Sequence, residues 1–327
     1  MVGPYGDWLR FPYEDVENLH IVPEIDCCRI VTDNSVEFLQ RVPPATAALL
    51  RIGSIEPAAM LLDAADAFES GSAASDEDAR DITKTGVLTE AIETCTDAAT
   101  REFDIGMQKR LLKAASFGLH FSFKDQDSES SHVMGGANGA LMSLSGTSGM
   151  DPMTMPSETA LTFTAAAKKM RTLNALRDPA VGFVLTSSQF DHITATGVIV
   201  RLVAMKRPAL AASISKFMML PKNVQLFARA AKAAAFVASD RSMSDAETAQ
   251  TAIRIIHEQE DSPDGPTRQP THTNGGYAPV ALAANEADRP GVAALLLMLE
   301  TSVAEKVPAL ISTGAFADAM AVATTAK

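Results

Sequence analysis

The sequence has few of the residues on which disulfide-rich, membrane-spanning and aromatic-rich proteins depend. Its 327 residues include three cysteines, one tryptophan and three tyrosines. Three cysteines, two of them adjacent at Cys27 and Cys28, cannot build a disulfide framework, so reduced thiols in a cytosolic compartment are expected. No apolar run reaches the length of a membrane-spanning helix, and the N-terminus lacks the basic and apolar regions of a signal peptide.

Positive charge is also scarce. The chain has 28 lysines and arginines against 40 aspartates and glutamates, which gives a formal net charge of −12 and a pI of about 5.0. A general nucleic-acid binder, or a protein that binds anionic membranes unaided, needs a broad basic surface. The composition therefore argues against nucleic acid as a partner and against direct membrane insertion.

Alanine, by contrast, is abundant, with 54 residues beside only 18 aromatic ones. Alanine is the best helix-forming residue and a poor strand former. The bulk of the chain is therefore predicted to be helical, in a mainly α fold.

Residues 1–42 are the exception to this helical composition. They contain the only tryptophan, two of the three tyrosines and short β-rich runs such as LHIV at 19–22 and RIVT at 29–32. Turn-forming residues separate these runs, which predicts three or four short strands. So few strands cannot close a sandwich or barrel alone, so we expect this segment to be the last piece of a larger β-domain.

Residues 43–327 have helical spacing, divided by glycines and prolines into helices of about 10–16 residues. Many helices joined by short breaks indicate an α-solenoid, a stack of antiparallel helices, although no clean repeat period emerges. Two stretches of low-complexity composition, at 124–157 and 260–275, are predicted to be flexible insertions. The helices are expected near 57–68, 75–84, 87–100, 105–117, 158–175, 187–206, 208–219, 222–238, 244–259, 278–287, 291–302, 305–312 and 315–325.

No catalytic, cofactor-binding or metal-binding motif is evident. The six histidines are scattered, and none has the spacing of a metal site or lies beside a cysteine. No pair of carboxylates lies in an apolar run that would favour acid–base catalysis. A helical enzyme stays open only if the fold gathers His120 or His192 with two or more carboxylates in a concave pocket.

Binding is better supported, because the charge changes sign locally. Between residues 168 and 232 the chain has 11 basic and 2 acidic residues. Such an asymmetry can steer an acidic protein partner, although ordinary lysines and arginines on solvated helix faces account for it equally well. A solenoid that associates with itself, as clathrin-type coats do, is a further alternative.

Several segments together resemble one known family. They are VGPYGD at 2–7, LHIVPEID at 19–26, QKRLLKAASFG at 108–118, LNALRD at 173–178, LTSSQF at 185–190 and RLV at 201–203. In this order they are similar to the vacuolar protein sorting-associated protein 16 family, core subunits of the HOPS and CORVET endolysosomal tethering complexes. The likeness covers nearly the whole chain except the two low-complexity stretches.

The resemblance implies a β-propeller followed by an α-solenoid, with residues 1–42 as closing propeller strands and the chain as a fragment of that arrangement. It implies a non-enzymatic scaffold without cofactors, cytoplasmic and held at late endosome or vacuole membranes through its complex. The implied partners are the other HOPS or CORVET subunits and the SM-family subunit, vacuolar protein sorting-associated protein 33. Binding of the SM-family subunit maps to about 157–242, where the expected contact residues are Ala175, Leu176, Arg177, Arg201, Arg207, Arg229 and Lys232.

Overall fold

A computed structural model describes residues 8, 10–14, 16–72, 75–128, 157–239, 242–257 and 276–325. The chain divides into two compact units, residues 1–189 and 190–327, and each is described by itself. Most of the described residues are helical, and the strands are confined to the N-terminal part, which confirms the mainly α fold with a short β segment.

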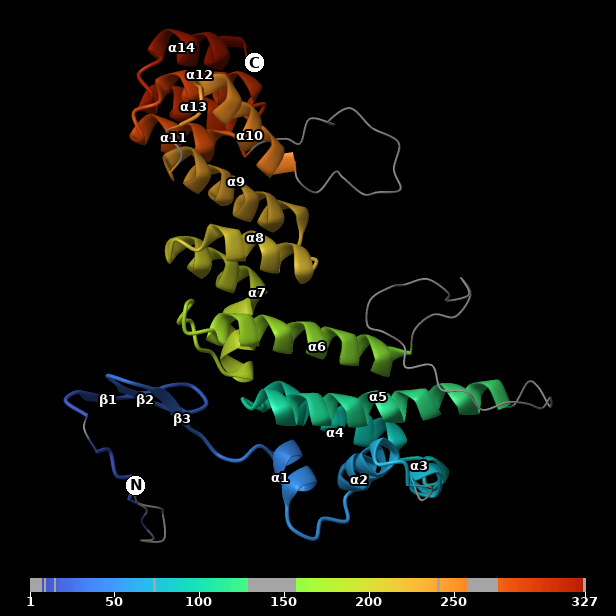
Figure 1. The fold of residues 1–327 in the computed structure, drawn as a ribbon. Coiled ribbons are helices and arrows are strands. Elements are labelled where there is room, and N and C mark those ends of the chain that lie inside the picture. Colours follow the sequence, from blue (N-terminus) through green and yellow to red (C-terminus); the bar gives the residue numbers. More distant parts are fainter. Residues whose placement is uncertain are drawn as a thin grey trace. The chain divides into compact units, whose positions relative to one another are not determined.

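The strands of unit 1 form one antiparallel sheet in the order β1–β2–β3 (Figure 1). Ile21 pairs with Ile30 across the first ladder, and Ile30 pairs with Glu37 across the second. The turn between β1 and β2 is closed by a hydrogen bond of 2.9 Å from Glu24 N to Cys27 O. The strands are β1 Leu19–Pro23, β2 Cys28–Thr32 and β3 Val36–Leu39. Their assignment to a propeller stays a prediction.

The helices of unit 1 stack through alanine-rich faces. Helix α4 packs on α2, α5 and α6, so it lies at the centre of the unit (Figure 1). Prolines at the first position begin α1 and α2, where their missing N–H costs nothing. The helices are α1 Pro44–Leu50, α2 Pro57–Glu69, α3 Ser75–Lys84, α4 Leu88–Arg101, α5 Ile105–Ser128 and α6 Glu158–Arg177.

Gly118 lies at a close contact between α5 and the helices α4 and α2. A Cβ atom at Gly118 would lie 2.7 Å from Ile92 Cγ1 on α4 and 3.1 Å from Leu61 Cδ2 on α2. The first distance is shorter than real Cβ contacts and the second is tighter than most of them, so a side chain at this position would force Ile92 or Leu61 to move.

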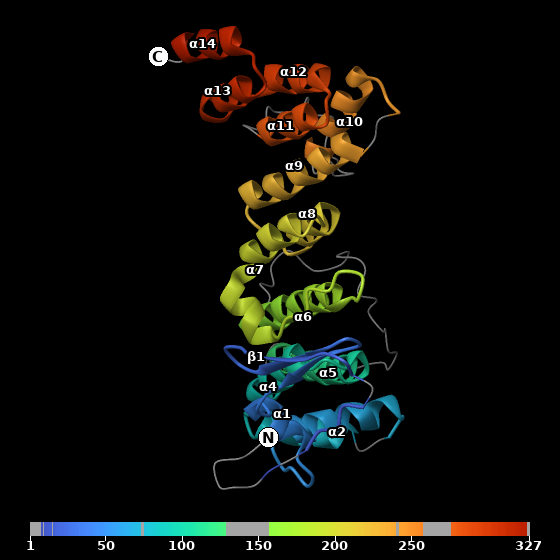
Figure 2. The ribbon, with the colours of Figure 1, turned by 90° about the vertical axis from the view of Figure 1, so that its left-hand side faces the viewer.

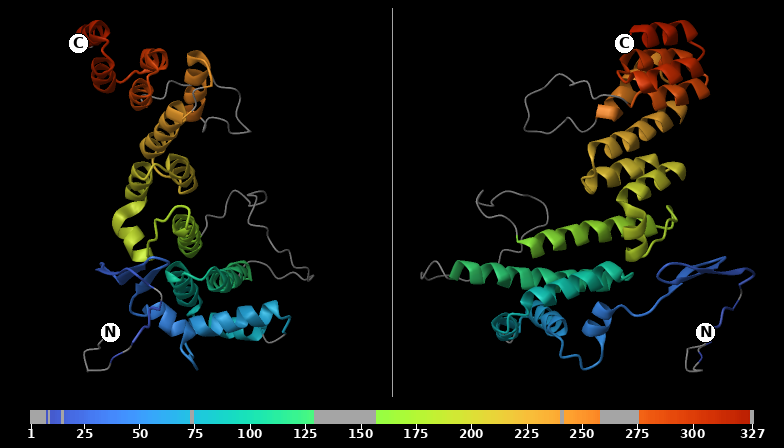
Figure 3. Two further views of the ribbon diagram at one scale, coloured as in Figure 1. Left: turned by 60° about the vertical axis from the view of Figure 1, so that its left-hand side comes forward. Right: turned by 180° about the vertical axis from the view of Figure 1, so that it is seen from behind.

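Helix α7 (Ser187–Ala204) begins in unit 1 and continues in unit 2, and its helical geometry is interrupted at Thr194. In unit 2, α9 packs on α8, α10 and α11, and α11 packs on α12 and α13 (Figures 2 and 3). A capping box begins α10, since Ser244 and Glu247 each accept a hydrogen bond from the other's backbone N–H. The helices are α8 Pro208–Phe217, α9 Lys222–Ser239, α10 Asp245–His257, α11 Ala278–Glu286, α12 Pro290–Leu299, α13 Val303–Ser312 and α14 Phe316–Thr325.

The core of unit 2 is built mainly from alanine, with Ala233, Ala252 and Ala281 fully buried among valines and leucines. Small side chains let helix backbones approach closely, which explains how a chain with few aromatic residues fills its interior. Among the helices that the structure describes, none is both long enough and apolar enough to cross a bilayer.

The two predicted insertions differ in outcome. Helix α5 extends to Ser128, into the segment predicted as an insertion from residue 124. The reason is local, because residues 124–128 contain no glycine or proline to end the helix. Ser157 already caps α6 by accepting a hydrogen bond from Ala160 N. Residues 129–156 and 258–275 lie outside the described residues.

Candidate partner-binding surfaces

The residues predicted to bind a partner fall into both units. Ala175, Leu176 and Arg177 end α6 in unit 1. The other four residues belong to unit 2, on α7, at the start of α8 and on α9: Arg201, Arg207, Arg229 and Lys232. The two groups are therefore separate candidate surfaces, and their contact with a partner stays a prediction.

At the end of α6 the three predicted residues have different environments. Ala175 is half-buried, whereas Leu176 is 0% exposed and lies in the interior of the chain. The guanidinium of Arg177 lies 3.8 Å from the centre of the Phe103 ring and donates hydrogen bonds to Leu185 O. Leu176 and Arg177 therefore hold the end of α6 in place. Ala175 and Arg177 are both partly exposed, and of these two only Arg177 is engaged by its side chain in these contacts.

A pair of amide side chains fixes the preceding turn of α6. Asn174 Nδ2 donates to Gln108 Oε1 at 2.7 Å, and Gln108 Nε2 donates to Asn174 Oδ1 at 3.2 Å. Gln108 Nε2 also donates to Glu102 O, and this carbonyl accepts a further bond from Arg177. Because Gln108 is buried, these bonds are protected from water and tie α6 to the connection between α4 and α5.

Burial lowers the pKa of Arg177 but does not remove its charge. Loss of hydration lowers its pKa to about 10, and the nearby carboxylate of Glu102 opposes that shift. The side chain is therefore still positively charged at neutral pH, although it is partly shielded from water and lies over the Phe103 ring.

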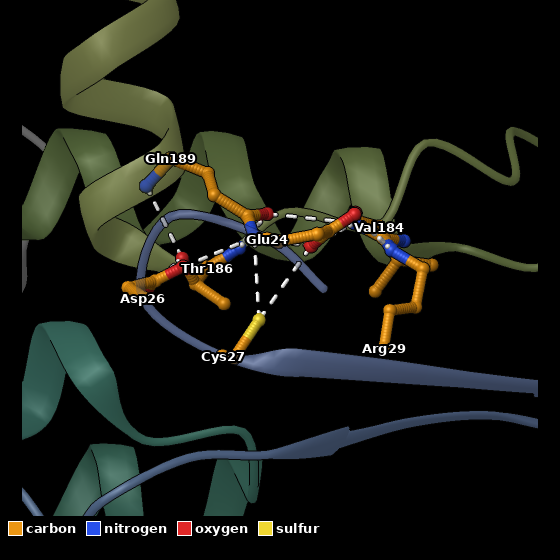
Figure 4. Close-up of polar contacts among 7 residues, drawn as sticks. All are labelled: Glu24, Asp26, Cys27, Arg29, Val184, Thr186 and Gln189. Carbon is orange, nitrogen blue, oxygen red and sulfur yellow. Dashed lines mark hydrogen bonds and ion pairs between the residues drawn. The ribbon is translucent and has the colours of Figure 1, made fainter. Parts of the chain in front are cut away.

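The β1–β2 turn makes a second set of fixed contacts in unit 1 (Figure 4). Thr186 and Gln189 form a capping box at the start of α7, since Gln189 N donates to Thr186 Oγ1 and Thr186 N donates to Gln189 Oε1. The turn places the carboxylates of Glu24 and Asp26 against this box. Both accept hydrogen bonds from Gln189 Nε2, and Asp26 also accepts one from Thr186 Oγ1 at 2.6 Å.

Arg29 completes this network, in which every charge has a partner. Its guanidinium donates to both carboxylate oxygens of Glu24, at 2.7 and 3.1 Å, and to Val184 O at 3.1 Å. Burial raises the pKa of Glu24, but hydrogen bonding and the positive charge of Arg29 outweigh it, so the pKa lies below its ordinary value. Burial and the nearby carboxylates raise the pKa of Cys27 to about 12, so its thiol is protonated at neutral pH.

In unit 2, the structure brings two of the four predicted residues together. Arg229 and Lys232, on α9, line a hollow of about 190 Å³ with Lys216 of α8. Arg229 Nε donates to Gln225 O at 3.3 Å, which holds its guanidinium along α9. Arg201 and Arg207 are exposed and do not line this hollow. We call this cavity the α8–α9 hollow; its lining is Ala212, Ser213, Ser215, Lys216, Gln225, Arg229 and Lys232.

Sequence reasoning did not single out Lys216 or Gln189. Lys216 lies in the basic stretch between residues 168 and 232. Its place beside Arg229 and Lys232 depends on the packing of α8 against α9, which the number of charges in the sequence does not reveal. Gln189 follows Thr186 by three residues, and this spacing is the signature of a capping box. Its two distant carboxylate partners have no local signal.

The arrangement expected of an enzyme is not seen in the part of the chain that the structure describes. His120 and His192 are exposed, and neither lines the α8–α9 hollow. No group of three or more histidine, cysteine or carboxylate side chains is placed to hold a metal ion among the described residues.

The described part of the chain is mainly helical, with alanine-rich helices packed on one another, and its candidate sites are surfaces and helix ends. These features are typical of a helical protein that binds other proteins. The comparison with known proteins is more specific. Residues 1–131 match the family described as Vps16, N-terminal region. The chain is 33% identical to Protein VACUOLELESS1 of Arabidopsis thaliana over 314 residues. The aligned region covers 96% of the chain and 30% of that relative.

Similar matches occur in distant eukaryotes. The vacuolar protein sorting-associated protein 16 homologue of Dictyostelium discoideum is 29% identical over 310 residues, 94% of the chain and 31% of that relative. The homologue of Drosophila melanogaster is 27% identical over 324 residues, 99% of the chain and 32% of that relative. The chain is therefore similar to the Vps16 proteins over nearly its whole length, and it spans about 30% of the length of these relatives.

Proposed function

We propose that the chain is a non-enzymatic scaffold segment of an endolysosomal or vacuolar tethering complex. In this proposal it binds and positions the SM-family subunit, vacuolar protein sorting-associated protein 33, for membrane fusion. The names of the relatives, which describe vacuolar protein sorting, and the stacked helices of both units support this class. Other HOPS or CORVET subunits would hold it at late endosome or vacuole membranes.

The observation that supports the proposal is the excess of basic residues on α7, α8 and α9 of unit 2. From His192 to Ser239 the sequence has no aspartate or glutamate, while seven lysines and arginines fall on α7, α8 and α9 or between them. Arg201 and Arg207 are exposed, and Arg229 and Lys232 line the α8–α9 hollow. In a chain of net charge −12, such a surface favours a folded partner that presents carboxylates.

Unit 1 supports the scaffold role through its rigidity. The contacts of Arg177, Gln108 and Asn174 fix the end of α6 before any partner arrives. A surface already in its binding conformation loses little conformational entropy on association. Ala175, held within this fixed turn, allows close approach because its side chain is a single methyl group.

The test is size-exclusion chromatography with light scattering of the chain mixed with the SM-family subunit. The proposal expects a stable one-to-one complex that weakens as the salt concentration rises. Separate elution of the two proteins at micromolar concentration would contradict it. Sedimentation of the chain alone distinguishes the self-associating coat, which would give oligomers that grow with concentration.

A further inference from the structure

Helix α7 contains a backbone break that its sequence does not encode. At Thr194 the φ angle is 66° and the ψ angle is 155°, inside an element that is otherwise helical. Glycine occupies this region of backbone space almost alone, and a β-branched residue such as threonine is strained there. The sequence pattern predicts one helix over 187–206, with neither glycine nor proline at the break itself. The break therefore opposes the local preference of the chain.

The part of α7 before the break is fixed at its N-terminal end. Thr186 and Gln189 form the capping box that begins the helix, and Gln189 Nε2 also donates to the carboxylates of Glu24 and Asp26. Thr186 and Gln189 are both buried. These contacts with the β1–β2 turn set the direction in which residues 187–193 leave the cap.

The part of α7 after the break is fixed by a buried face. Val198, Ile199 and Leu202 are each 0% exposed. Burial of three branched apolar side chains favours the one orientation that keeps all three out of water. The two parts of α7 are thus held independently, and the break lies between the residues that hold them.

Thr194 itself is exposed, so its backbone conformation is not imposed by packing of its own side chain. Its Oγ1 accepts a hydrogen bond of 3.3 Å from Gly197 N, which is the bond that an N-cap residue makes to a new helix. This cap compensates part of the strain in the kinked form. A continuous α7 would lose the cap, but it would have unstrained backbone at Thr194 and unbroken helical hydrogen bonding.

We propose that Thr194 is a hinge at which α7 changes between the kinked form and a continuous helix. The local sequence favours the continuous form, and the contacts that hold the two parts of α7 favour the kinked one. The change alters the direction of Arg201, an exposed residue after the break, relative to the cap at the start of α7. A partner that binds one form more tightly shifts the population toward it. The hinge is a property of the chain alone, so its test is independent of the proposed function.

The test measures the distance between spin labels at His192 and Ala204, which are exposed on either side of the hinge. A ketone-bearing amino acid at each position carries the label, so the native cysteines stay unmodified. In a continuous helix, a rise of about 1.5 Å per residue separates these positions by about 18 Å along the axis, and the kinked form gives a different distance. We expect electron paramagnetic resonance of the full chain to show two distances.

Two substitutions at the hinge should shift the populations in opposite directions. Thr194→Gly should raise the ratio of kinked to continuous form about fivefold or more, because glycine adopts a positive φ angle without strain. Thr194→Ala should lower that ratio, because alanine cannot cap the new helix and is the best helix former. A single distance in the wild-type chain that neither variant alters would overturn the proposal.

The matched control is Thr196, an exposed threonine of α7 whose φ angle is not positive. Thr196→Gly should change the ratio of the two forms much less than Thr194→Gly does. It should also lower the thermal unfolding midpoint, as glycine does inside a helix, whereas Thr194→Gly should raise it. Circular dichroism establishes that each variant keeps its helices. Equal lowering of the midpoint by both glycine substitutions would show that Thr194 carries no strain, and would overturn the hinge.

Discussion

Arg177 and Phe103 form the contact that holds the end of α6 on the α4–α5 connection, with the guanidinium carbon 3.8 Å from the ring centre. The contact is part of a row of four side chains. Phe103 lies 5.4 Å from Phe38 of β3, and Arg29 of β2 lies 4.6 Å from Phe38. Two arginines thus enclose two phenylalanines, and the row joins the sheet to α6.

The row predicts a structural role for Arg177. Arg177→Ala should lower the free energy of unfolding by about 2–4 kcal/mol, because it removes the ring contact, both hydrogen bonds to Leu185 O and one of the two side-chain hydrogen bonds to Glu102 O. Thermal unfolding measures the loss. Hydrogen exchange should rise at the end of α6 and in residues 178–186. The control is Arg171→Ala, which removes an exposed arginine from the same helix; equal destabilisation by both variants would contradict the assignment.

Ala175 gives a prediction about binding. Ala175→Asp should abolish association with the SM-family subunit while the helical circular dichroism spectrum is unchanged. A larger charged group at a close contact both clashes and loses its hydration without gaining a partner. Isothermal titration calorimetry measures the affinity. Ala165→Asp makes the same change at an exposed position earlier in α6 and should bind normally. Full-strength binding by Ala175→Asp would remove Ala175 from the interface.

The Glu24 network predicts a pH dependence of stability. Because the pKa of Glu24 in the folded chain lies below its ordinary value, its stabilisation is fully present above the unfolded pKa of about 4.3 and is lost as the pH falls through the folded pKa. Glu24→Gln should therefore lower the unfolding midpoint at pH 7, and the difference from the wild type should shrink below pH 4.

The control for this pH effect is Glu93→Gln, at an exposed position on α4. It should leave both the midpoint and its pH dependence close to those of the wild type. A difference between Glu24→Gln and the wild type that stayed constant from pH 7 to pH 3 would show that the carboxylate charge is not what the network uses.

Gly118 predicts the cost of filling a close helix contact. Gly118→Val should destabilise the chain by about 1–3 kcal/mol or more, because its side chain would overlap Ile92 and Leu61 and force α5 away from α4. Ser116→Val introduces the same side chain at an exposed position of α5 and isolates the effect of packing from that of helix propensity. Chemical denaturation compares the two, and equal stability would show that the helices readily separate.

The sequence predicted the helices well because their ends are encoded locally. Pro57, Pro208 and Pro290 occupy first-turn positions of helices that begin at these residues. The end of α5 was predicted wrongly, because the helix expected over 105–117 stops before Gly118 and a polar insertion was expected from residue 124. Helix α5 continues through both to Ser128.

The candidate sites were less predictable, because they depend on tertiary contacts. The capping box of Thr186 and Gln189 has a local pattern, yet Gln189 binds Glu24, 165 residues earlier in the sequence. Arg177 was expected as a contact residue from the family resemblance, and its position over Phe103 follows from the packing of α6. Lys216 enters the α8–α9 hollow only because α8 and α9 are neighbours.

The most direct test of the scaffold proposal is the affinity of the chain for the SM-family subunit, vacuolar protein sorting-associated protein 33, measured by calorimetry at two salt concentrations. The account predicts one-to-one binding that weakens with salt, and Arg229→Glu should weaken it further at the lower salt. No detectable binding of the wild-type chain at either salt concentration would contradict it.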